Sequence, residues 1–289
     1  MVTLETVSPL INEAAAALDR AGVDSPRLCA RLIMAHVLGC TREKLLTYPD
    51  TPLSFDDKSV FWRLIARRSR GEPLAYITGH KEFYGLDFGV DENVLIPRPE
   101  TEILVETVLN HYKSRQPCVF ADIGTGSGIL AVTLAVEMPS SFSLACDISP
   151  AALGVAGQNA VKHGVQGRTG FFTSDLGTGI KTSALDFIVS NPPYLSSDEF
   201  SNVSFEISKF EPYKALVSME NGYCHFRRLE SIAHRILREK GMIFLEMGKD
   251  QGAHLANLFS RWKDVTVYKD LAGHDRVLSA VKKPLHPEL

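Results

Sequence analysis

The chain has 289 residues, a length that suits two domains of ordinary size better than one. Hydrophobic residues make up 45% and charged residues 22%, which is typical of a soluble globular enzyme and excludes a disordered chain. The formal charge of -3 argues against a protein held on nucleic acid mainly by phosphate contacts, because such proteins carry a strong basic excess.

From about residue 4 to residue 71 the pattern is helical. The apolar positions of the first helix recur at steps of three and four residues: Val7, Ile11, Ala14 and Leu18. Ser25 followed by Pro26 predicts a helix start, and the glycines at 22, 39 and 71 fall where helices would end. We therefore predict a bundle of roughly four helices.

Four arginines in this bundle, at 63, 67, 68 and 70, lie on or beside one helical face. We favour a solvated face, with contact to an acidic partner or to nucleic acid as the alternative.

In the stretch FYGLDFGVDENVLIP the helical pattern gives way to alternating apolar residues, interrupted by glycine and turn-prone residues. It predicts a β-hairpin that links two domains. In the following PRPETE, Pro97 and Pro99 hold the chain extended around Arg98 before a helix begins near Glu100.

From Cys118 onward, short β-rich runs alternate with helical stretches. The seven runs are CVFADIG, SLACDIS, TGFFTSD, LDFIVS, GMIFLEMG, DVTVYKD and DRVLSAVKK. This alternation predicts a parallel sheet with helices on both faces, and the short spacing of the last two runs predicts an antiparallel final strand. The fold class is therefore α/β: an N-terminal helical bundle (1–75), a β-hairpin linker (76–99) and a C-terminal Rossmann-like seven-stranded domain (100–289).

The five cysteines are widely spaced and include no Cys-x-x-Cys pair, so we expect reduced thiols and no bound metal. The N-terminal residues lack a basic segment followed by an apolar one, and nowhere do about 18 apolar residues run together. We expect a cytoplasmic protein without membrane contact.

A glycine-rich loop, ADIGTGSG, stands between the first strand of this domain and a helix, where a ligand can approach the backbone. Gly124, Gly126 and Gly128 do not fit G-x-G-x-x-G, because Ile129 stands at the last position, and no Gly-Lys-Ser/Thr follows. The spacing favours a nucleoside ligand without pyrophosphate. The alternative is a tight turn with a helix cap.

Acidic residues end the next two strands. Asp147 lies nineteen residues after Gly128, about where a carboxylate accepts hydrogen bonds from ribose hydroxyls. Asp175 is a candidate acceptor for an adenine amino group, with Leu176 over the ring, although Asp175 is equally suited to cap the following turn.

The apolar strand FIVS ends on Asn191, Pro192, Pro193 and Tyr194. The prolines contribute no N–H, so the segment offers carbonyl groups in a fixed shape. The Asn191 side-chain oxygen and the Pro192 carbonyl are placed to accept both hydrogens of a planar NH2 group, with Tyr194 against its plane. Such a site holds a weak nitrogen nucleophile and favours methyl transfer from a sulfonium. A simple turn is the alternative.

With these motifs the chain resembles S-adenosylmethionine-dependent methyltransferases, and it is most similar to the release factor glutamine methyltransferase (HemK-type) family. The resemblance spans nearly the whole chain. The segments most characteristic of the family are residues 71–106, together with DIGTGSG and SNPPY. It implies that the protein methylates the amide of the glutamine in the Gly-Gly-Gln motif of class 1 peptide chain release factors, using S-adenosyl-L-methionine.

The resemblance also implies site residues. The cofactor loop falls on Gly124, Thr125, Gly126, Ser127 and Gly128, the ribose acid on Asp147, and the substrate and catalytic quartet on Asn191, Pro192, Pro193 and Tyr194. Asn191 is also expected to touch the cofactor, Arg98 to lie near the substrate entrance, and residues 1–75 to dock the substrate. Leu176 departs from the aromatic residue that relatives often have, which puts the adenine contact in doubt. We expect a monomer.

Two other functions compete with this one. A nucleic-acid methyltransferase acting on an exocyclic amino group of adenine or cytosine would present the same planar NH2. However, residues 1–80 carry ten Lys/Arg and nine Asp/Glu, so no basic accessory domain is evident and no nucleic-acid substrate is expected. A non-catalytic, cofactor-bound module of the translation machinery is the third possibility, and the intact quartet argues against it.

Overall fold

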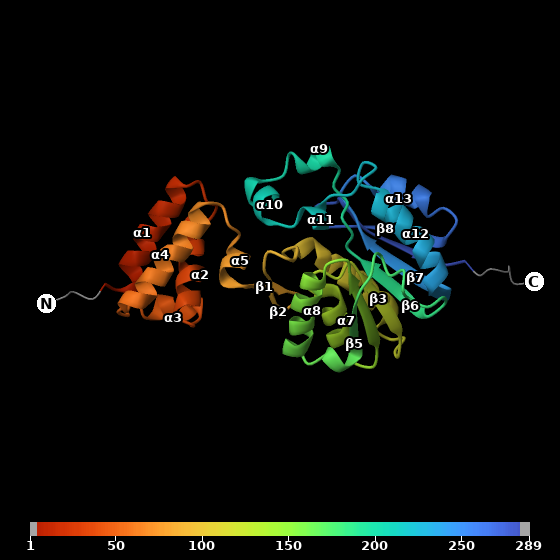
Figure 1. The fold of residues 1–289 in the computed structure, drawn as a ribbon, viewed down its shortest axis with the longest axis horizontal. Helices are drawn as coiled ribbons and strands as arrows, with labels where there is room; N and C mark the ends of the chain where they lie inside the picture. Colours follow the sequence, from red (N-terminus) through yellow and green to blue (C-terminus); the bar gives the residue numbers. More distant parts are fainter. Residues whose placement is uncertain (1–4, 284–289) are drawn as a thin grey trace, which may run out of the picture. The chain divides into compact units, whose positions relative to one another are not determined.

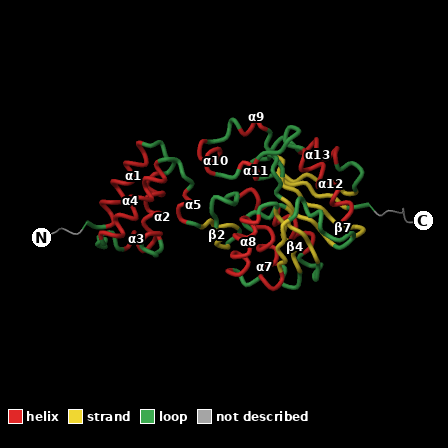
Figure 2. The backbone as a smooth tube through the Cα atoms, viewed as in Figure 1, coloured by secondary structure: helices red, strands yellow, loops and turns green. Residues whose placement is uncertain are grey.

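The computed structural model describes residues 5–283 and divides the chain into two compact units (Figure 1). The first unit comprises the chain up to His80 together with Ser204–Phe210, and the second comprises Lys81–Val203 and the chain from Glu211 onward. Helices form the first unit, whereas the strands of the large sheet all belong to the second (Figure 2). None of the helices in residues 5–283 has the length and apolar content that crossing a bilayer requires.

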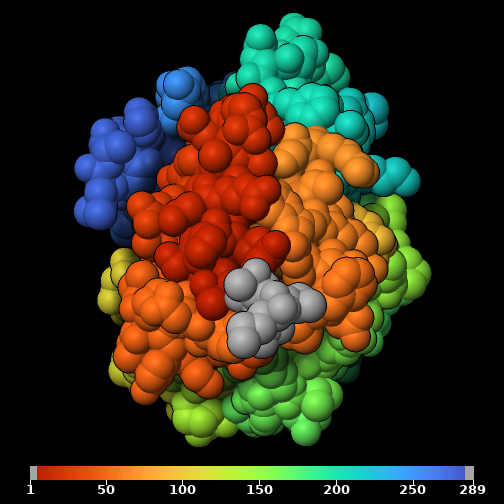
Figure 3. Space-filling model, turned by 90° about the vertical axis from the view of Figure 1, so that its left-hand side faces the viewer, coloured from red at the N-terminus to blue at the C-terminus, as the bar shows by residue number. Residues whose placement is uncertain are grey.

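The first unit is a helical bundle built on apolar helix faces. Its helices are α1 (Val7–Arg20), α2 (Pro26–Val37), α3 (Arg42–Thr47), α4 (Phe55–Ser69), α5 (Leu74–Thr78) and α10 (Phe205–Phe210). The side chains of Thr41 and Ser54 cap α3 and α4 by accepting backbone hydrogen bonds. Leu18, Ile33 and Phe61 are fully buried in the shared core. Figure 3 shows the outer surface of this unit in red and orange.

Helix α10 joins this bundle from a distant part of the sequence, which the sequence boundaries did not anticipate. Arg68 of α4 is only 7% exposed, so the expectation of a solvated arginine face is wrong for this residue. Its Nη1 donates to the Glu206 carboxylate at 2.9 Å and to the Glu72 carbonyl at 2.7 Å. Gly71 has a φ of 88°, and a Cβ there would lie 3.0 Å from the Phe205 ring, so a glycine is needed for α10 to pack this closely.

The predicted hairpin is confirmed as β1 (His80–Phe83) and β2 (Leu86–Gly89). Both turn residues, Tyr84 and Gly85, have positive φ, as a two-residue turn between twisted strands requires. Phe83 and Phe88 are buried and their rings meet edge to face at 6.2 Å, which anchors the hairpin in the core of the second unit.

The second unit contains the predicted seven-stranded sheet in the order β5-β4-β3-β6-β7-β9-β8. Its strands are β3 (Val119–Ile123), β4 (Phe142–Asp147), β5 (Thr169–Thr173), β6 (Leu185–Ser190), β7 (Leu237–Glu246), β8 (Lys263–Lys269) and β9 (Asp275–Val281). The first five pair in parallel, and β9 inserts antiparallel between β7 and β8, as predicted.

Helices cover both faces of this sheet, which explains its continuously apolar strands. The helical elements of the unit are η1 (Pro99–Thr101), α6 (Glu102–Tyr112), α7 (Ile129–Glu137), α8 (Pro150–Lys162), η2 (Gln166–Arg168), α9 (Ser197–Phe200), α11 (Tyr213–Leu216), α12 (Cys224–Ile236) and α13 (Gly252–Leu258). Phe120, Phe187 and Phe244 face α6 and α7, whereas α12 and α13 pack on the opposite face. Because β3 pairs in parallel with both β4 and β6, the carboxyl ends of these three strands lie side by side.

We expect Glu206→Ala to increase amide hydrogen exchange across residues 205–210 by roughly tenfold, because the buried Arg68 guanidinium loses an acceptor worth about 1–3 kcal/mol. Exchange followed by mass spectrometry measures this. Glu220→Ala is the control, because its ion pair with Arg227 is about half exposed and contributes little. Equal exchange in both variants would show that the Arg68–Glu206 pair does not hold α10.

Candidate active site

A cavity of about 410 Å³ lies at the carboxyl ends of β3, β4 and β6. Ten of the predicted site residues line it: Arg98, Gly124, Thr125, Gly126, Ser127, Asp147, Asp175, Leu176, Asn191 and Pro193. Gly128, Pro192 and Tyr194 are not among the lining residues. Residues distant in sequence thus meet because parallel strands deliver their ends to one edge of the sheet.

The glycine loop is held against the end of β4. The amides of Gly124 and Thr125 donate to the Cys146 carbonyl at 2.9 and 3.0 Å. Gly124 and Gly126 have φ values of 74° and 53°, and a Cβ at either would meet no atom within 4 Å. Since both line the cavity, their missing side chains leave room for a ligand against the backbone.

Gly128 has a different task. A Cβ on it would lie 3.0 Å from the Cβ of Ala156 in α8, and its φ is 83°. The third glycine therefore allows α7, which begins at Ile129, to pack closely on α8.

Asp147 braces the loop and faces the cavity. Its Oδ2 accepts from the Gly126 amide and its Oδ1 from the Ser149 amide, both at 2.9 Å. A carboxylate oxygen has two lone pairs, so each retains capacity to accept from a ligand hydroxyl. This fits a ribose diol lying over the open glycines.

Asp122, inside β3, is a site residue that the sequence analysis missed. It is fully buried and accepts from the Thr125 hydroxyl at 2.6 Å and from the Ala131 amide at 3.0 Å. Burial raises the pKa of this carboxyl to about 7, against these hydrogen bonds. An acid within the apolar run VFADIG was the available signal. Asp122 ties the glycine loop to the first turn of α7.

The third strand end is less open. Asp175 pairs with Arg228 at 2.5 Å, and both side chains are nearly half exposed. Leu176 has a φ of 53°, unusual for a side chain of its size, and packs against the core. The adenine contact therefore remains a prediction, in which Asp175 would have to accept beside its arginine.

His225, also unanticipated, lines the cavity and pairs through Nδ1 with the Ser218 hydroxyl at 2.7 Å. Burial lowers its pKa, followed by the effect of Arg228. His225 therefore presents a neutral imidazole on this wall near pH 7.

Asn191, the first residue after β6, lies on the cavity wall. Its Nδ2 donates to the hydroxyl of the buried Thr101 at 3.2 Å, which leaves Oδ1 to accept from a ligand. Tyr194 packs against the core, and its carbonyl accepts from Gln251 Nε2 at 3.1 Å. Burial, followed by the nearby Glu246 carboxyl, raises the Tyr194 pKa, so its ring carries a neutral hydroxyl.

Arg98 is held by an acidic residue, Glu211, that follows the quartet in the sequence. Its Nη2 donates to Glu211, which is 6% exposed and also accepts from the Ile96 amide at 3.2 Å. Pro212, Tyr213 and Lys214, the residues after Glu211, line the same cavity. The Glu211 carboxylate thus holds the Pro97–Arg98 segment at the cavity wall.

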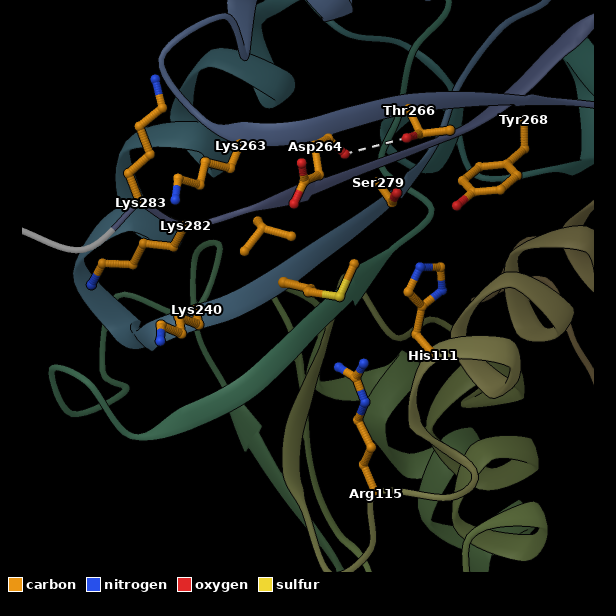
Figure 4. Close-up of a pocket in the computed structure, with 12 residues that line it drawn as sticks. His111, Arg115, Lys240, Lys263, Asp264, Thr266, Tyr268, Ser279, Lys282 and Lys283 are labelled. Carbon is orange, nitrogen blue, oxygen red and sulfur yellow. Dashed lines mark hydrogen bonds between the residues drawn. The ribbon is translucent and has the colours of Figure 1, made fainter. Parts of the chain in front are cut away.

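A larger cavity, of about 840 Å³, lies elsewhere in the second unit (Figure 4). Its wall carries Arg115, Lys240 and Lys263, and it is formed by the end of α6 with β7, β8 and β9. The glycine loop and the quartet do not contribute to this wall, so the smaller cavity is the candidate active site.

The sheet order, the open glycine loop, the acid after β4 and the Asn-Pro-Pro-Tyr quartet after β6 together define a Rossmann-like methyltransferase. A methyltransferase from Pyrococcus furiosus shares this fold with a TM-score of 0.53 and 18% identity, covering 76% of this chain and 98% of that structure. The families described as "PrmC N-terminal domain" and "Methyltransferase small domain" match residues 9–79 and 99–207.

Two relatives are similar over nearly their full length. The release factor glutamine methyltransferase of Nitratidesulfovibrio vulgaris is 43% identical, covering 98% of this chain and 97% of the relative. That of Koribacter versatilis is 39% identical, covering 94% and 97%. The chain belongs to the release factor glutamine methyltransferase family.

Alanine variants at two glycines should distinguish a packing role from a ligand-binding role. Gly128→Ala should lower the free energy of unfolding by about 2 kcal/mol or more, because the new methyl group meets Ala156 and the backbone is left-handed. Gly124→Ala bears only the backbone cost, and its methyl group enters the cavity. It should lose less stability but weaken S-adenosylmethionine binding at least about tenfold. Denaturant unfolding and calorimetry measure the two effects, and identical behaviour of the two variants would contradict this division.

Proposed function

We propose that this protein transfers a methyl group from S-adenosyl-L-methionine to the side-chain amide nitrogen of the glutamine in the Gly-Gly-Gln motif of class 1 peptide chain release factors. The observation that carries the proposal is the position of Asn191, with its amide nitrogen engaged by Thr101, in the same cavity as the open glycine loop and Asp147. The full-length similarity to release factor glutamine methyltransferases supports the same reaction.

In this proposal the open glycines and Asp147 would hold the cofactor, with Asp147 accepting from its ribose. The cofactor supplies an electrophilic methyl group when bound. The Asn191 Oδ1 and the Pro192 carbonyl accept the two hydrogens of the glutamine NH2, and Tyr194 packs near the amide plane. These acceptors return electron density to a nitrogen whose lone pair is delocalised, and they fix its line of attack. As the N–C bond forms and the S–C bond breaks, the amide proton leaves along one of these hydrogen bonds to solvent.

We also propose that the helical bundle, residues 1–75, docks the release factor and that Arg98 stands near the entrance of the glutamine. The protein acts as a cytoplasmic monomer, which size-exclusion chromatography with light scattering tests directly.

A nucleic-acid amino group would satisfy the same two acceptors, so the substrate class must follow from reach and charge. A glutamine at the tip of a Gly-Gly-Gln loop enters a cavity of about 410 Å³ as an extended side chain, whereas a flipped base needs more room. The balanced charge of residues 1–80 also favours a protein substrate.

Asn191→Ala should lower turnover by roughly a hundredfold or more, the scale for losing one oriented polar contact in the transition state. S-adenosylmethionine affinity should fall far less than turnover, because the glycine loop and Asp147 are untouched, and the variant should remain folded. Initial rates with radiolabelled cofactor, together with calorimetry, measure the three quantities. Near-normal turnover in the folded variant would remove Asn191 from the reaction.

The substrate test uses an intact release factor. We expect one added methyl group, located by mass spectrometry on the Gly-Gly-Gln glutamine, and none on a Gln→Glu version, which presents no NH2 group. A free Gly-Gly-Gln peptide should be a poorer substrate if the helical bundle contributes docking contacts. Label that enters DNA or RNA but not the release factor would overturn the proposal in favour of a nucleic-acid methyltransferase.

A further inference from the structure

The quartet leaves β6 with few hydrogen bonds of its own. Its two prolines have no N–H group, so neither can be held by donating to a neighbouring backbone. Among the described residues, Thr101 accepts from the Asn191 side chain at the start of the quartet. The next hydrogen bond along the quartet is at its end, where the Tyr194 carbonyl accepts from Gln251 Nε2 at 3.1 Å. The shape of the segment between these two points therefore depends on how firmly each of them is held.

Gln251, the residue before α13, uses both ends of its side-chain amide. While Nε2 donates to the Tyr194 carbonyl, Oε1 accepts from the Gly248 amide at 2.9 Å. The two partners fix the orientation of the side chain, because a backbone carbonyl only accepts and a backbone N–H only donates. Gln251 is 8% exposed and is not among the residues that line the candidate active site. It thus ties the connection between β7 and α13 to the end of the quartet.

A third segment packs against the same carbonyl. Gly222 has a φ of 89°, and a Cβ on it would lie 2.2 Å from the Tyr194 carbonyl oxygen and 3.0 Å from Gln251 Nε2. Donor and acceptor are therefore both in contact with a backbone position that has no room for a side chain. The following residue is paired as well, because the Leu195 carbonyl accepts from the Ser218 amide at 2.8 Å. The end of the quartet is thus held by two other segments of the chain.

We propose that Gln251 is a positioning residue, which holds the Tyr194 carbonyl and thereby directs the Pro192 carbonyl toward the substrate amide. The proline rings restrict φ, so the remaining freedom of the segment lies mainly in ψ, and it is removed when both flanks are held. This inference rests on the proposed methyl transfer to an amide nitrogen and deepens it. Gln251 does not touch the substrate and acts through the backbone of Tyr194.

Gln251→Glu tests the donated hydrogen bond, because it removes the N–H donor and keeps a side-chain oxygen that accepts from the Gly248 amide. At saturating cofactor and release factor, kcat per folded molecule should fall by roughly tenfold or more, the scale for misplacing an oriented contact. Cofactor affinity should fall far less than kcat, because Gln251 lies outside the cavity wall. Initial rates and calorimetry measure the two quantities.

An ionised glutamate at this buried position opposes folding, so Gln251→Met provides a second variant, uncharged and of similar length, that also lacks the donor. Gln116→Glu is the matched control. Gln116 Nε2 donates to the Lys113 carbonyl and its Oε1 accepts from the Ser140 amide, both at 3.0 Å and outside the cavity wall. The control should keep its kcat. A merely structural Gln251 would instead lower the unfolding midpoint and leave kcat per folded molecule unchanged.

Gly222→Ala tests the same contact from the opposite side. Its new methyl group displaces the Tyr194 carbonyl or Gln251 Nε2, so kcat per folded molecule should again fall by roughly tenfold. Gly164→Ala is the control, because Gly164 has a φ of 69° and a Cβ there would meet no atom within 4 Å. This control bears the backbone cost alone and should keep its kcat. Equal kcat in the two alanine variants would contradict the inference.

An NMR measurement separates this inference from the proposed function, because it requires no substrate. Tyr194–Leu195 is the only Tyr-Leu pair in the sequence, so carbon-13 in tyrosine carbonyls combined with nitrogen-15 in leucine gives one correlated signal. The Tyr194 carbonyl shift should change in Gln251→Glu and Gln251→Met and stay constant in Gln116→Glu. An unchanged shift in both folded Gln251 variants, or wild-type kcat in both, overturns the inference. A wild type whose carbonyl shift responds as expected but which methylates no release factor would refute the proposed function instead.

Discussion

Parallel pairing of β3 with β4 on one side and with β6 on the other is the constraint on which the site depends. It brings the glycine loop, Asp147 and Asn191, which span nearly seventy residues of sequence, to one edge of the sheet. The hydrogen bonds from Gly124 and Thr125 to the Cys146 carbonyl, and from Gly126 to Asp147, then join two of these ends into one surface. A shift of one strand by a residue would turn these groups into the core.

Two buried carboxyls lie near this edge of the sheet. Asp122 supports the glycine loop from within β3, and Glu246 is buried at the end of β7. Both have a raised pKa because burial disfavours their charge. Buried charged groups often lower stability relative to apolar ones, and Asp122 orders the glycine loop that faces the cavity.

The segment after the quartet has two tasks in succession. Its α10 packs with the N-terminal helices through Arg68 and Glu206, and the next residue, Glu211, holds Arg98 at the cavity wall. Residues 204–210 thus leave the unit that contains the sheet and return to it within seven positions. This connection makes the segment a structural link between the part of the chain proposed to dock a release factor and the wall of the cavity where a glutamine would enter.

The sequence by itself determined the fold class, the seven strands and the antiparallel last strand. These follow from the apolar periodicity and the spacing of the runs, which are local properties of the sequence, and each of the seven observed strands overlaps one of the seven predicted runs. The sequence also predicted that the glycine loop, Asp147 and Asn191 belong to one site, since each follows a strand whose end can be recognised, and these residues line one cavity. Only the tertiary structure decided which buried polar groups support them. Thr101 and Glu211 look like ordinary residues of a helix start and a loop, and their contacts with Asn191 and Arg98 depend on neighbours far away in the chain. Arg68 shows the same limit, because its burial depends on α10, and no local pattern encodes a partner 138 residues away.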